Sequence, residues 1–299
     1  MSSTTRSVLS TIESPSTVAR RLSVVRRHWR QLGLHVIFLA ISVLYLLPLL
    51  WMLSTSLTLS GRELSIPPHF IPDPIVWHNY LEAVTVEPML TFLRNTLLIG
   101  VTATSAGLLS SSLAGYAFAR LRFPGRDLLF GACLATLMLP GVVTLIPQFL
   151  VFKEVGWIGT FWPLIVPPSL GGGAFMIFLF RQYALTIPLE IDEAARVDGA
   201  NAFQIWWSLI LPLAEPVLAT IAVLSFIYHW NDFLQPLVYL QSPKLYTLAV
   251  GLSFFQGEYQ TEWNLMMAAA ALMLLPIVIL FFFAQRYFVQ GIVMTGIKG

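Results

Sequence analysis

Six long apolar runs constrain most strongly what this 299-residue chain can fold into. Five contain no Asp, Glu, His, Lys or Arg, namely Val36–Leu57, Thr96–Ala119, Leu128–Phe152, Phe161–Phe180 and Trp263–Gln285. The sixth, Leu213–Asn231, carries Glu215 and Pro216 near its start and His229 near its end. A helix that crosses the roughly 30 Å hydrocarbon core needs about 20 predominantly apolar residues. The runs therefore predict an all-α membrane protein with six transmembrane helices.

Composition excludes a water-soluble fold. Only 11% of the residues are charged and 57% are hydrophobic, whereas about a quarter of the residues in a soluble domain are charged. Solid apolar runs also differ from the short segments of alternating polarity that transmembrane strands require. The basic stretch of residues 1–30 precedes the first run, and we expect it to be a cytoplasmic tail. Residues 31–299 then form the membrane domain, with a core at residues 90–286.

Lysine and arginine predict the orientation. With the amino terminus in the cytoplasm and six alternating spans, only Arg62, Arg94, Lys153 and Lys244 of the 17 basic residues fall on the outer side. The other 13 (17 − 4) fall on the cytoplasmic side, which agrees with the positive-inside rule, and the reverse orientation violates that rule. Both termini are therefore expected in the cytoplasm.

The longest predicted cytoplasmic loop, IPLEIDEAARVDGANAFQIWWSLILPLAEP, has the pattern of two short helices joined by a turn. Pro188 suits the start of the first helix, and Asp192 with Arg196 predicts an exposed pair four residues apart. Gly199 ends that helix because it tolerates a positive φ. Physical chemistry alone leaves two interpretations open: a thin acidic helix that docks into a cleft of another protein, or an ordinary connecting loop.

The same loop resembles the EAA loop of ABC-importer permeases. The run Glu193-Ala194-Ala195, then Gly199 four residues later, then Leu209-Ile210-Leu211-Pro212 follows the family pattern, with Leu209 where the family has isoleucine. The resemblance implies that this segment is the coupling helix, which sits in a groove of a cytoplasmic ATPase. It implies ATPase-coupling roles for Glu193, Ala194, Ala195, Asp198 and Gly199, with Glu193 contacting a basic residue of that ATPase.

Four further stretches resemble the carbohydrate-uptake, maltose-permease-like branch of these binding-protein-dependent transport systems. They are AGYAFARLRFPGR, WNDFLQPL, YTLAVGL and the ending QRYFVQGIVMTGIKG. The resemblance implies a type I ABC-importer permease fold in the bacterial inner membrane. It also implies three partners: a second, non-identical permease, a dimeric ABC ATPase, and an extracytoplasmic binding protein that delivers a sugar. A glycerol-3-phosphate or other polyol substrate is equally consistent with the branch.

A substrate path is less visible in the sequence. Trp230, Asn231 and Asp232 lie at the outer end of the run Leu213–Asn231. An apolar stretch follows, which Pro236, Pro243 and Lys244 interrupt. This stretch is expected to be a re-entrant or surface loop, because irregular backbone at membrane depth needs cover by protein or water. Aromatic and polar side chains suit sugar rings. For Trp230, the aromatic belt at the membrane interface is an alternative explanation.

Other functional classes are disfavoured by what the sequence lacks. Proton or sodium coupling usually places ionisable residues deep in the spans, so a secondary transporter is the weaker alternative. The sequence contains no G-x-x-x-x-G-K-[ST] motif, and Gly171-Gly172-Gly173 lies in an apolar run beside Pro167 and Pro168. Those glycines favour a bend or close helix packing. We expect no catalytic constellation, metal site or cofactor, and ATP hydrolysis on a separate subunit.

Overall fold

The computed structural model describes residues 15–63, 70–257 and 261–296, with side chains described from residue 31 to residue 285. The described residues are helical or irregular, apart from one bridge between Gln256 and Thr261. The chain divides into two compact units, Met1–Ser54 and Thr55–Gly299. The first consists of nearly all of α1 (Pro15–Ser56), whose apolar side chains are mostly exposed.

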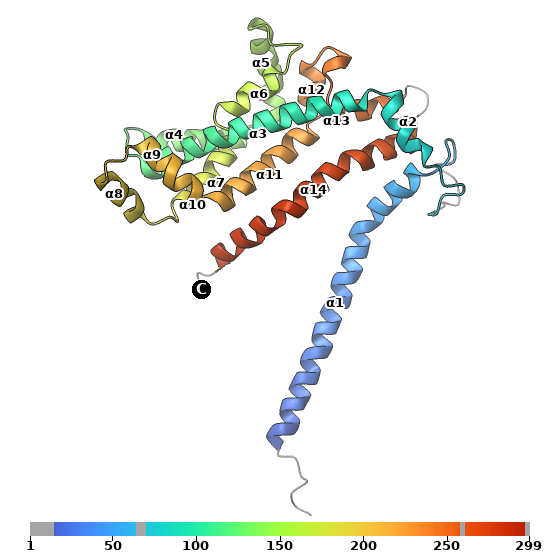
Figure 1. Ribbon diagram of the computed structural model, residues 1–299, viewed down its shortest axis with the longest axis horizontal. Helices are drawn as coiled ribbons and strands as arrows, with labels where there is room; N and C mark the ends of the chain where they lie inside the picture. Colours follow the sequence, from blue (N-terminus) through green and yellow to red (C-terminus); the bar gives the residue numbers. More distant parts are fainter. Residues whose placement is uncertain (1–14, 64–69, 258–260, 297–299) are drawn as a thin grey trace, which may run out of the picture. The chain divides into compact units, whose positions relative to one another are not determined.

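The second unit is built around α3 (Met89–Arg120), a 32-residue helix. Figure 1 shows α3 running the length of this unit, with α6 (Trp162–Ser169), α7 (Ala174–Ala184) and α11 (Glu215–Asn231) packed along it. The long helix α14 (Trp263–Gly296) packs against α11 and α2 (His78–Val86). Since α3 packs against α6, α7 and α11, it lies at the centre of this unit.

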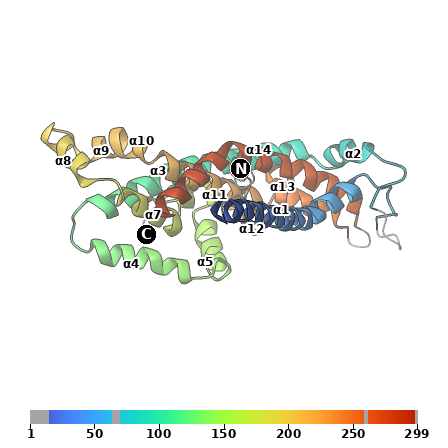
Figure 2. The ribbon, with the colours of Figure 1, turned by 90° about the horizontal axis from the view of Figure 1, so that it is seen from below.

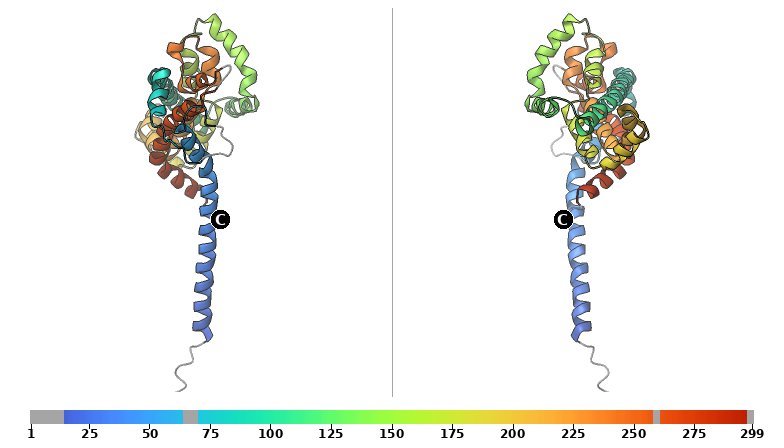
Figure 3. Two further views of the ribbon diagram at one scale, coloured as in Figure 1. Left: turned by 90° about the vertical axis from the view of Figure 1, so that its right-hand side faces the viewer. Right: turned by 90° about the vertical axis from the view of Figure 1, so that its left-hand side faces the viewer.

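The predicted spans are recovered as four segments without a sharp bend and two bent pairs. Gln31–Ser56, Met89–Arg120, Trp162–Ala184 and Trp263–Gln285 are long and apolar enough to cross a membrane. Arg126–Met138 with Gly141–Glu154 and Ala202–Leu213 with Glu215–Asn231 are bent by 104° and 83°. In Figure 2, the first bend separates α4 (Arg126–Ala135) from α5 (Gly141–Glu154). The side views of Figure 3 show the same two helices as an arch.

The bend between α4 and α5 has a cause in the backbone. Pro140 follows the short η2 (Thr136–Met138) and lies in extended backbone, so the chain changes direction before α5 begins. Counting each bent pair as one span gives six. The count of six remains a prediction, because these segments are identified as possible spans only by their length and composition.

Glycines allow close packing between α3 and the break that separates α6 from α7. Gly171, Gly172 and Gly173 all have positive φ values, of 132°, 66° and 94°. A Cβ atom added at Gly172 would lie 2.6 Å from the backbone oxygen of Gly107 in α3. The serine hydroxyl of Ser110 accepts a hydrogen bond from the Gly171 amide at 3.1 Å. The triplet thus interrupts the helix, and of the two expectations, a bend or close helix packing, the close packing against α3 is observed.

Near the amino-terminal end of α3, two polar side chains bind the interrupted stretch that follows α11. This stretch contains α12 (Leu234–Tyr239), η4 (Pro243–Leu245), α13 (Leu248–Leu252) and η5 (Ser253–Phe255). The Asn95 amide donates to the backbone oxygens of Lys244 and Tyr246 at 2.9 and 3.0 Å. The Thr96 hydroxyl accepts from the Leu248 amide at 2.8 Å. As expected, this stretch is not a continuous span but a series of short helices.

The first helix extends across the division expected at residue 30. Residues 1–14 lie outside the described part of the chain, and α1 begins at Pro15. Residues 15–30 therefore belong to the same helix as the first apolar run, and the cytoplasmic tail expected at residues 1–30 stays a prediction. Helix propagation across the basic segment explains this: once the apolar run nucleates a helix, adding residues to its end costs little.

Candidate functional site

The predicted coupling segment forms a compact elbow of two helices at one end of α3. The first, α8 (Leu189–Val197), begins after Pro188 and has Glu190 and Asp192 in its first turn and Arg196 in its last. This charge order stabilises the helix macrodipole at both ends. Figure 1 shows α8 at the same end of this unit as α9, α10 and the carboxyl end of α3. We call this the α8 end of the bundle.

Gly199 ends α8 in a left-handed conformation, as expected, with φ 87°. The amide of Ala200 donates to the Ala195 oxygen at 2.9 Å, and the amide of Gly199 donates to the Arg196 oxygen at 3.0 Å. These two bonds form a Schellman motif, which satisfies carbonyls left free at the helix end. Backbone hydrogen bonds therefore fix the conformation of the turn that follows α8.

The second helix starts immediately, with a capping box that the sequence analysis missed. The Asn201 side chain accepts from the Gln204 amide at 2.9 Å, and the Gln204 side chain accepts from the Asn201 amide at 2.8 Å. The chain continues through α9 (Ala202–Ile205), a π-helical segment η3 (Trp206–Ile210) and α10 (Leu211–Leu213). The N-x-x-Q spacing is a signal that could have found this cap.

The apolar half of the elbow anchors it to the bundle. Ile205, Trp206 and Ile210 are buried in one hydrophobic cluster with Tyr116 of α3 and Phe180 of α7. Full burial of one apolar side chain of this size stabilises the folded state by about 1.5–3 kcal/mol. The second helix is therefore part of the core, and α8 projects from a firmly held base.

Most of the predicted coupling residues face outward on α8. Glu193, Ala194, Asp198 and Gly199 are exposed, and Ala195 is half-buried. Val197, between them, is 88% exposed. The outward surface thus combines two carboxylates with small residues and one bare aliphatic side chain. Such a surface can approach a basic, concave partner closely and offer charge-assisted hydrogen bonds.

The expectation that Asp192 forms an exposed pair with Arg196 is wrong. Its side chain is fully buried, and its carboxylate lies 3.7 Å from Nε of Arg120 in α3. An NH2 group of Arg120 also donates to the Ile187 backbone oxygen at 2.5 Å. Asp192 turns inward because it lies three residues before Ala195, on the side of α8 that packs against the bundle. Sequence analysis could not identify Arg120 as the partner, since 72 residues separate them.

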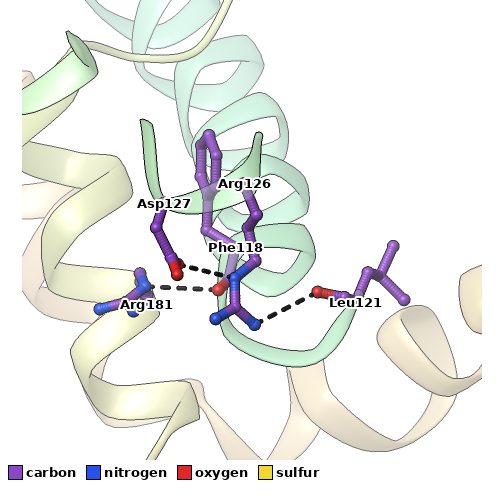
Figure 4. Close-up of polar contacts among 5 residues, drawn as sticks. All are labelled: Phe118, Leu121, Arg126, Asp127 and Arg181. Carbon is purple, nitrogen blue, oxygen red and sulfur yellow. Dashed lines mark hydrogen bonds and ion pairs between the residues drawn. The ribbon is translucent and has the colours of Figure 1, made fainter. Parts of the chain in front are cut away.

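Two further arginines brace the α8 end (Figure 4). Arg181 of α7 donates to the Phe118 oxygen at 3.4 Å, and its guanidinium lies 4.2 Å from the ring centre of Phe130. Arg126 pairs with Asp127 at 2.9 Å and donates to the Leu121 oxygen at 3.5 Å. These contacts satisfy carbonyls at the carboxyl end of α3 and fix its position against α4 and α7.

The candidate path residues at the far end of α11 are only partly brought together. Asn231 is exposed and Asp232 is half-buried, next to Tyr228, whose hydroxyl accepts from the Gln235 side chain at 3.2 Å. Burial raises the pKa of Asp232 to about 6, although hydrogen bonds from the Gln235 and Leu234 amides act in the opposite direction. Gln235 is a polar residue here that the sequence analysis did not single out.

Trp230 points the other way, into the core. It is 1% exposed, packs against Phe226, and its indole donates to the Met273 oxygen of α14 at 3.2 Å. The aromatic-belt interpretation is therefore wrong for this residue, because a belt residue must reach the membrane interface. A role of Trp230, Asn231 and Asp232 in a substrate path remains a prediction. Among the described residues, no group of three or more His, Cys, Asp or Glu is placed to hold a metal ion.

The comparison with protein families identifies the system to which this elbow belongs. Residues 107–294, which include α8 and both flanking helices, match the family described as binding-protein-dependent transport system inner membrane component. The chain belongs to this family. It is a permease subunit of an ABC importer and not an enzyme, and the ATPase is a separate subunit.

Similar proteins agree with this assignment over most of the permease. It is 34% identical to the arabinooligosaccharides transport system permease protein of Halalkalibacterium halodurans, over 77% of this chain and 82% of that protein. It is 33% identical to the sn-glycerol-3-phosphate transport system permease protein of Yersinia enterocolitica, over 86% of this chain and 94% of that protein.

A solved structure matches the fold of the permease. A chain of a bacterial ABC transporter involved in the import of the acidic polysaccharide alginate superposes with a TM-score of 0.74 at 25% identity. The match covers 93% of this chain and 99% of that chain. The expected ABC-importer permease architecture is thus confirmed.

Proposed function

We propose that this permease imports a sugar or oligosaccharide delivered by an extracytoplasmic binding protein, and that α8 couples the import to ATP hydrolysis. One observation carries the proposal: a rigid helical elbow presents Glu193, Ala194, Val197 and Asp198 at the end of the central helix α3. The carbohydrate class rests on the relatives, which are named for arabinooligosaccharide and alginate transport.

The chemistry of the exposed α8 surface fits a docking helix better than a loop in water. Val197 is 88% exposed and lies between the exposed carboxylates of Glu193 and Asp198, so it offers an apolar contact within a charged surface. An interface of small residues, one apolar contact and flanking charges packs tightly and selects a basic partner. We assign the partner as a groove of the cytoplasmic ATPase dimer.

A second permease subunit completes the assembly in this proposal. The bent pair α4–α5 leaves large apolar side chains uncovered within this unit, including Leu128 at 79%, Met138 at 83% and Ile146 at 71% exposed. Lipid or a partner helix must cover them. A path for a polar sugar needs walls on all sides, which two related permeases around a common axis provide.

Purification of the complex tests the function directly. The permease, its ATPase and its second permease subunit are reconstituted in vesicles, and uptake is measured with the binding protein loaded with candidate ligands. Uptake that requires both ATP and a sugar-loaded binding protein supports the proposal. Uptake only with glycerol-3-phosphate assigns the alternative substrate, and uptake driven by a proton or sodium gradient contradicts the coupling role.

The orientation is part of the proposal and has its own test. In a Cys133→Ser background, Val197→Cys on α8 should react with a membrane-impermeant thiol reagent only from the cytoplasmic side. Gln256→Cys, at the opposite end of the bundle, should react only from the outer side. Both side chains are exposed, so burial does not hide either thiol. Labelling of Gln256→Cys from the cytoplasm would contradict the topology.

The substrate path is proposed to include the polar cluster at the end of α11. Asn231→Ala and Asp232→Ala should each lower uptake by about tenfold, because each loses one hydrogen bond to a bound hydroxyl group, worth about 1–1.5 kcal/mol. ATPase association should not change, since α8 lies at the other end of the bundle. Gln256→Ala serves as a matched control, since this exposed side chain lies outside the cluster. Equal uptake by all three variants would remove the cluster from the path.

A further inference from the structure

A buried ion pair joins the coupling helix to the central helix of the bundle. Arg120 is the last residue of α3, and Asp192 lies in the first turn of α8. Nε of Arg120 is 3.7 Å from the Asp192 carboxylate, and the two side chains are 5% and 0% exposed. The same guanidinium donates to the Ile187 oxygen in the connection that precedes α8. One side chain of α3 therefore contacts both α8 and the segment leading to it.

The pair is incompletely hydrogen-bonded in the described part of the chain. Both Asp192 oxygens and Nε of Arg120 are buried and make no hydrogen bond there. A separation of 3.7 Å exceeds the range of a charge-assisted hydrogen bond. Buried charges normally close to such distances, because unsatisfied groups are costly in a low-dielectric environment. At 3.7 Å, the two buried charges attract each other without a hydrogen bond between them.

A second ion pair at the same end shows what an ordinary pair looks like. Arg126 and Asp127 are neighbours in sequence, their side chains are 31% and 80% exposed, and they lie at 2.9 Å (Figure 4). This pair is within hydrogen-bonding distance, is open to solvent and links no separate elements. Solvent screening makes such a pair weak. It therefore provides a matched control for the buried pair.

The helix attached to Arg120 is suited to carry a displacement across the bundle. With 32 residues, α3 is roughly 48 Å long at about 1.5 Å per residue. Its other end holds the backbone of Lys244, Tyr246 and Leu248 through Asn95 and Thr96. Within α3, Gly107 lies directly against the backbone of Pro168 and Gly172. Gly115 lies against the backbone of Ile177 and Arg181 in α7. One continuous helix thus links Arg120 to the segment that follows the candidate path residues.

We propose that Arg120 and Asp192 form the joint through which the movement of α8 is transmitted to α3. This inference rests on the proposed function of α8 and adds the residues that link it to the bundle. When the ATPase displaces α8, the separation of two opposite charges in a buried site is opposed by their attraction, so α3 follows. Arg120 and Asp192 are positioning residues, because neither reaches the outward surface that meets the ATPase.

The measured quantity is the amount of substrate transported per ATP hydrolysed in the reconstituted complex. Asp192→Asn removes the charge and keeps the shape, and Arg120→Met with Asp192→Leu replaces the pair by apolar side chains, which buried sites of this kind often tolerate. Both are expected to lower the ratio by about tenfold or more. Asp127→Asn, the control variant, removes an exposed carboxylate that contacts only its sequence neighbour, and it should keep the parental ratio.

Docking is measured separately, so that failure of the joint and failure of the proposed function differ. Val197→Cys should form a crosslink to the ATPase in the parent and in the Asp192→Asn background. Absence of this crosslink in the parent contradicts the role of α8 itself. A crosslink in both backgrounds, together with a lowered ratio in Asp192→Asn alone, supports the joint.

A parental ratio in the apolar double variant overturns the inference, whatever its yield, since it would show that packing alone suffices. If Asp192→Asn or the double variant does not assemble, Arg120→Lys decides. Lysine keeps the charge but lacks the planar fork that contacts both the Ile187 oxygen and Asp192. It should assemble and lower the ratio by about threefold. An unchanged ratio in Arg120→Lys would mean that the pair has only a structural role.

Discussion

Replacing Gly199 by leucine is expected to lower ATP-driven transport by about tenfold or more while the permease still inserts and assembles. Gly199 has φ 87°, and a left-handed conformation costs a leucine about 1–2 kcal/mol. A Cβ atom at this position would meet nothing within 4 Å, so steric contact plays no part. The change acts on the turn that sets the direction of α8 relative to α9.

Gly199→Asn is the matched control for this prediction. Asparagine is the other residue that ends helices in the left-handed conformation, so it should retain most of the transport. Uptake and ATP hydrolysis are measured together in the reconstituted complex, with membrane insertion followed by the yield of purified protein. If the leucine and asparagine variants transport equally, the conformation of residue 199 does not matter for coupling.

Reversing the charge of Glu193 is expected to have an effect of similar size. Glu193 is exposed on the outward side of α8, where we propose that it contacts a basic residue of the ATPase. Losing a charge-assisted hydrogen bond and adding repulsion costs about 2–4 kcal/mol, so Glu193→Lys should lower ATPase association by about 30-fold or more. Because the side chain makes no contact within the core, the fold of the permease should be unaffected.

Glu190→Lys isolates the position from the change in net charge. Glu190 is also exposed on α8, three residues earlier, and lies outside the group of predicted coupling residues. The measurement is the dissociation constant between detergent-solubilised permease and the ATPase at two salt concentrations. A specific contact predicts that Glu193→Lys weakens binding far more than Glu190→Lys. Equal weakening would indicate only a general electrostatic attraction between the two surfaces.

The Gly199 prediction depends on the stiffness of the elbow, whereas the Glu193 prediction depends on one contact. The Schellman bonds around Gly199 and the reciprocal bonds between Asn201 and Gln204 leave little freedom between α8 and α9. Ile205 and Ile210 then fix α9 and η3 in the core. A flexible connector would absorb a displacement of α8, whereas we expect this arrangement to pass it on in the proposed coupling role.

Much of this architecture follows from local features of the sequence. Apolar runs without charges fixed the positions of the main membrane helices, because burial in hydrocarbon forbids unpaired charges over about 20 residues. The loop pattern predicted the end of α8 at Gly199, since only a residue that tolerates positive φ can close that helix. The family resemblance in Glu193–Pro212 gave the role of the loop, and the family match confirmed the class of protein.

Other features depend on contacts between distant parts of the chain, which no local pattern encodes. The sequence predicted a surface position for Asp192, but the tertiary structure buries it against Arg120. Trp230 was expected near an interface or a path, and packing against Phe226 and the Met273 oxygen places it in the core. The sequence by itself determined which segments are helical and where α8 ends, because backbone conformation and hydrophobicity are local properties. Only the tertiary structure decided which polar side chains turn inward, because burial depends on partners that lie far away in the sequence.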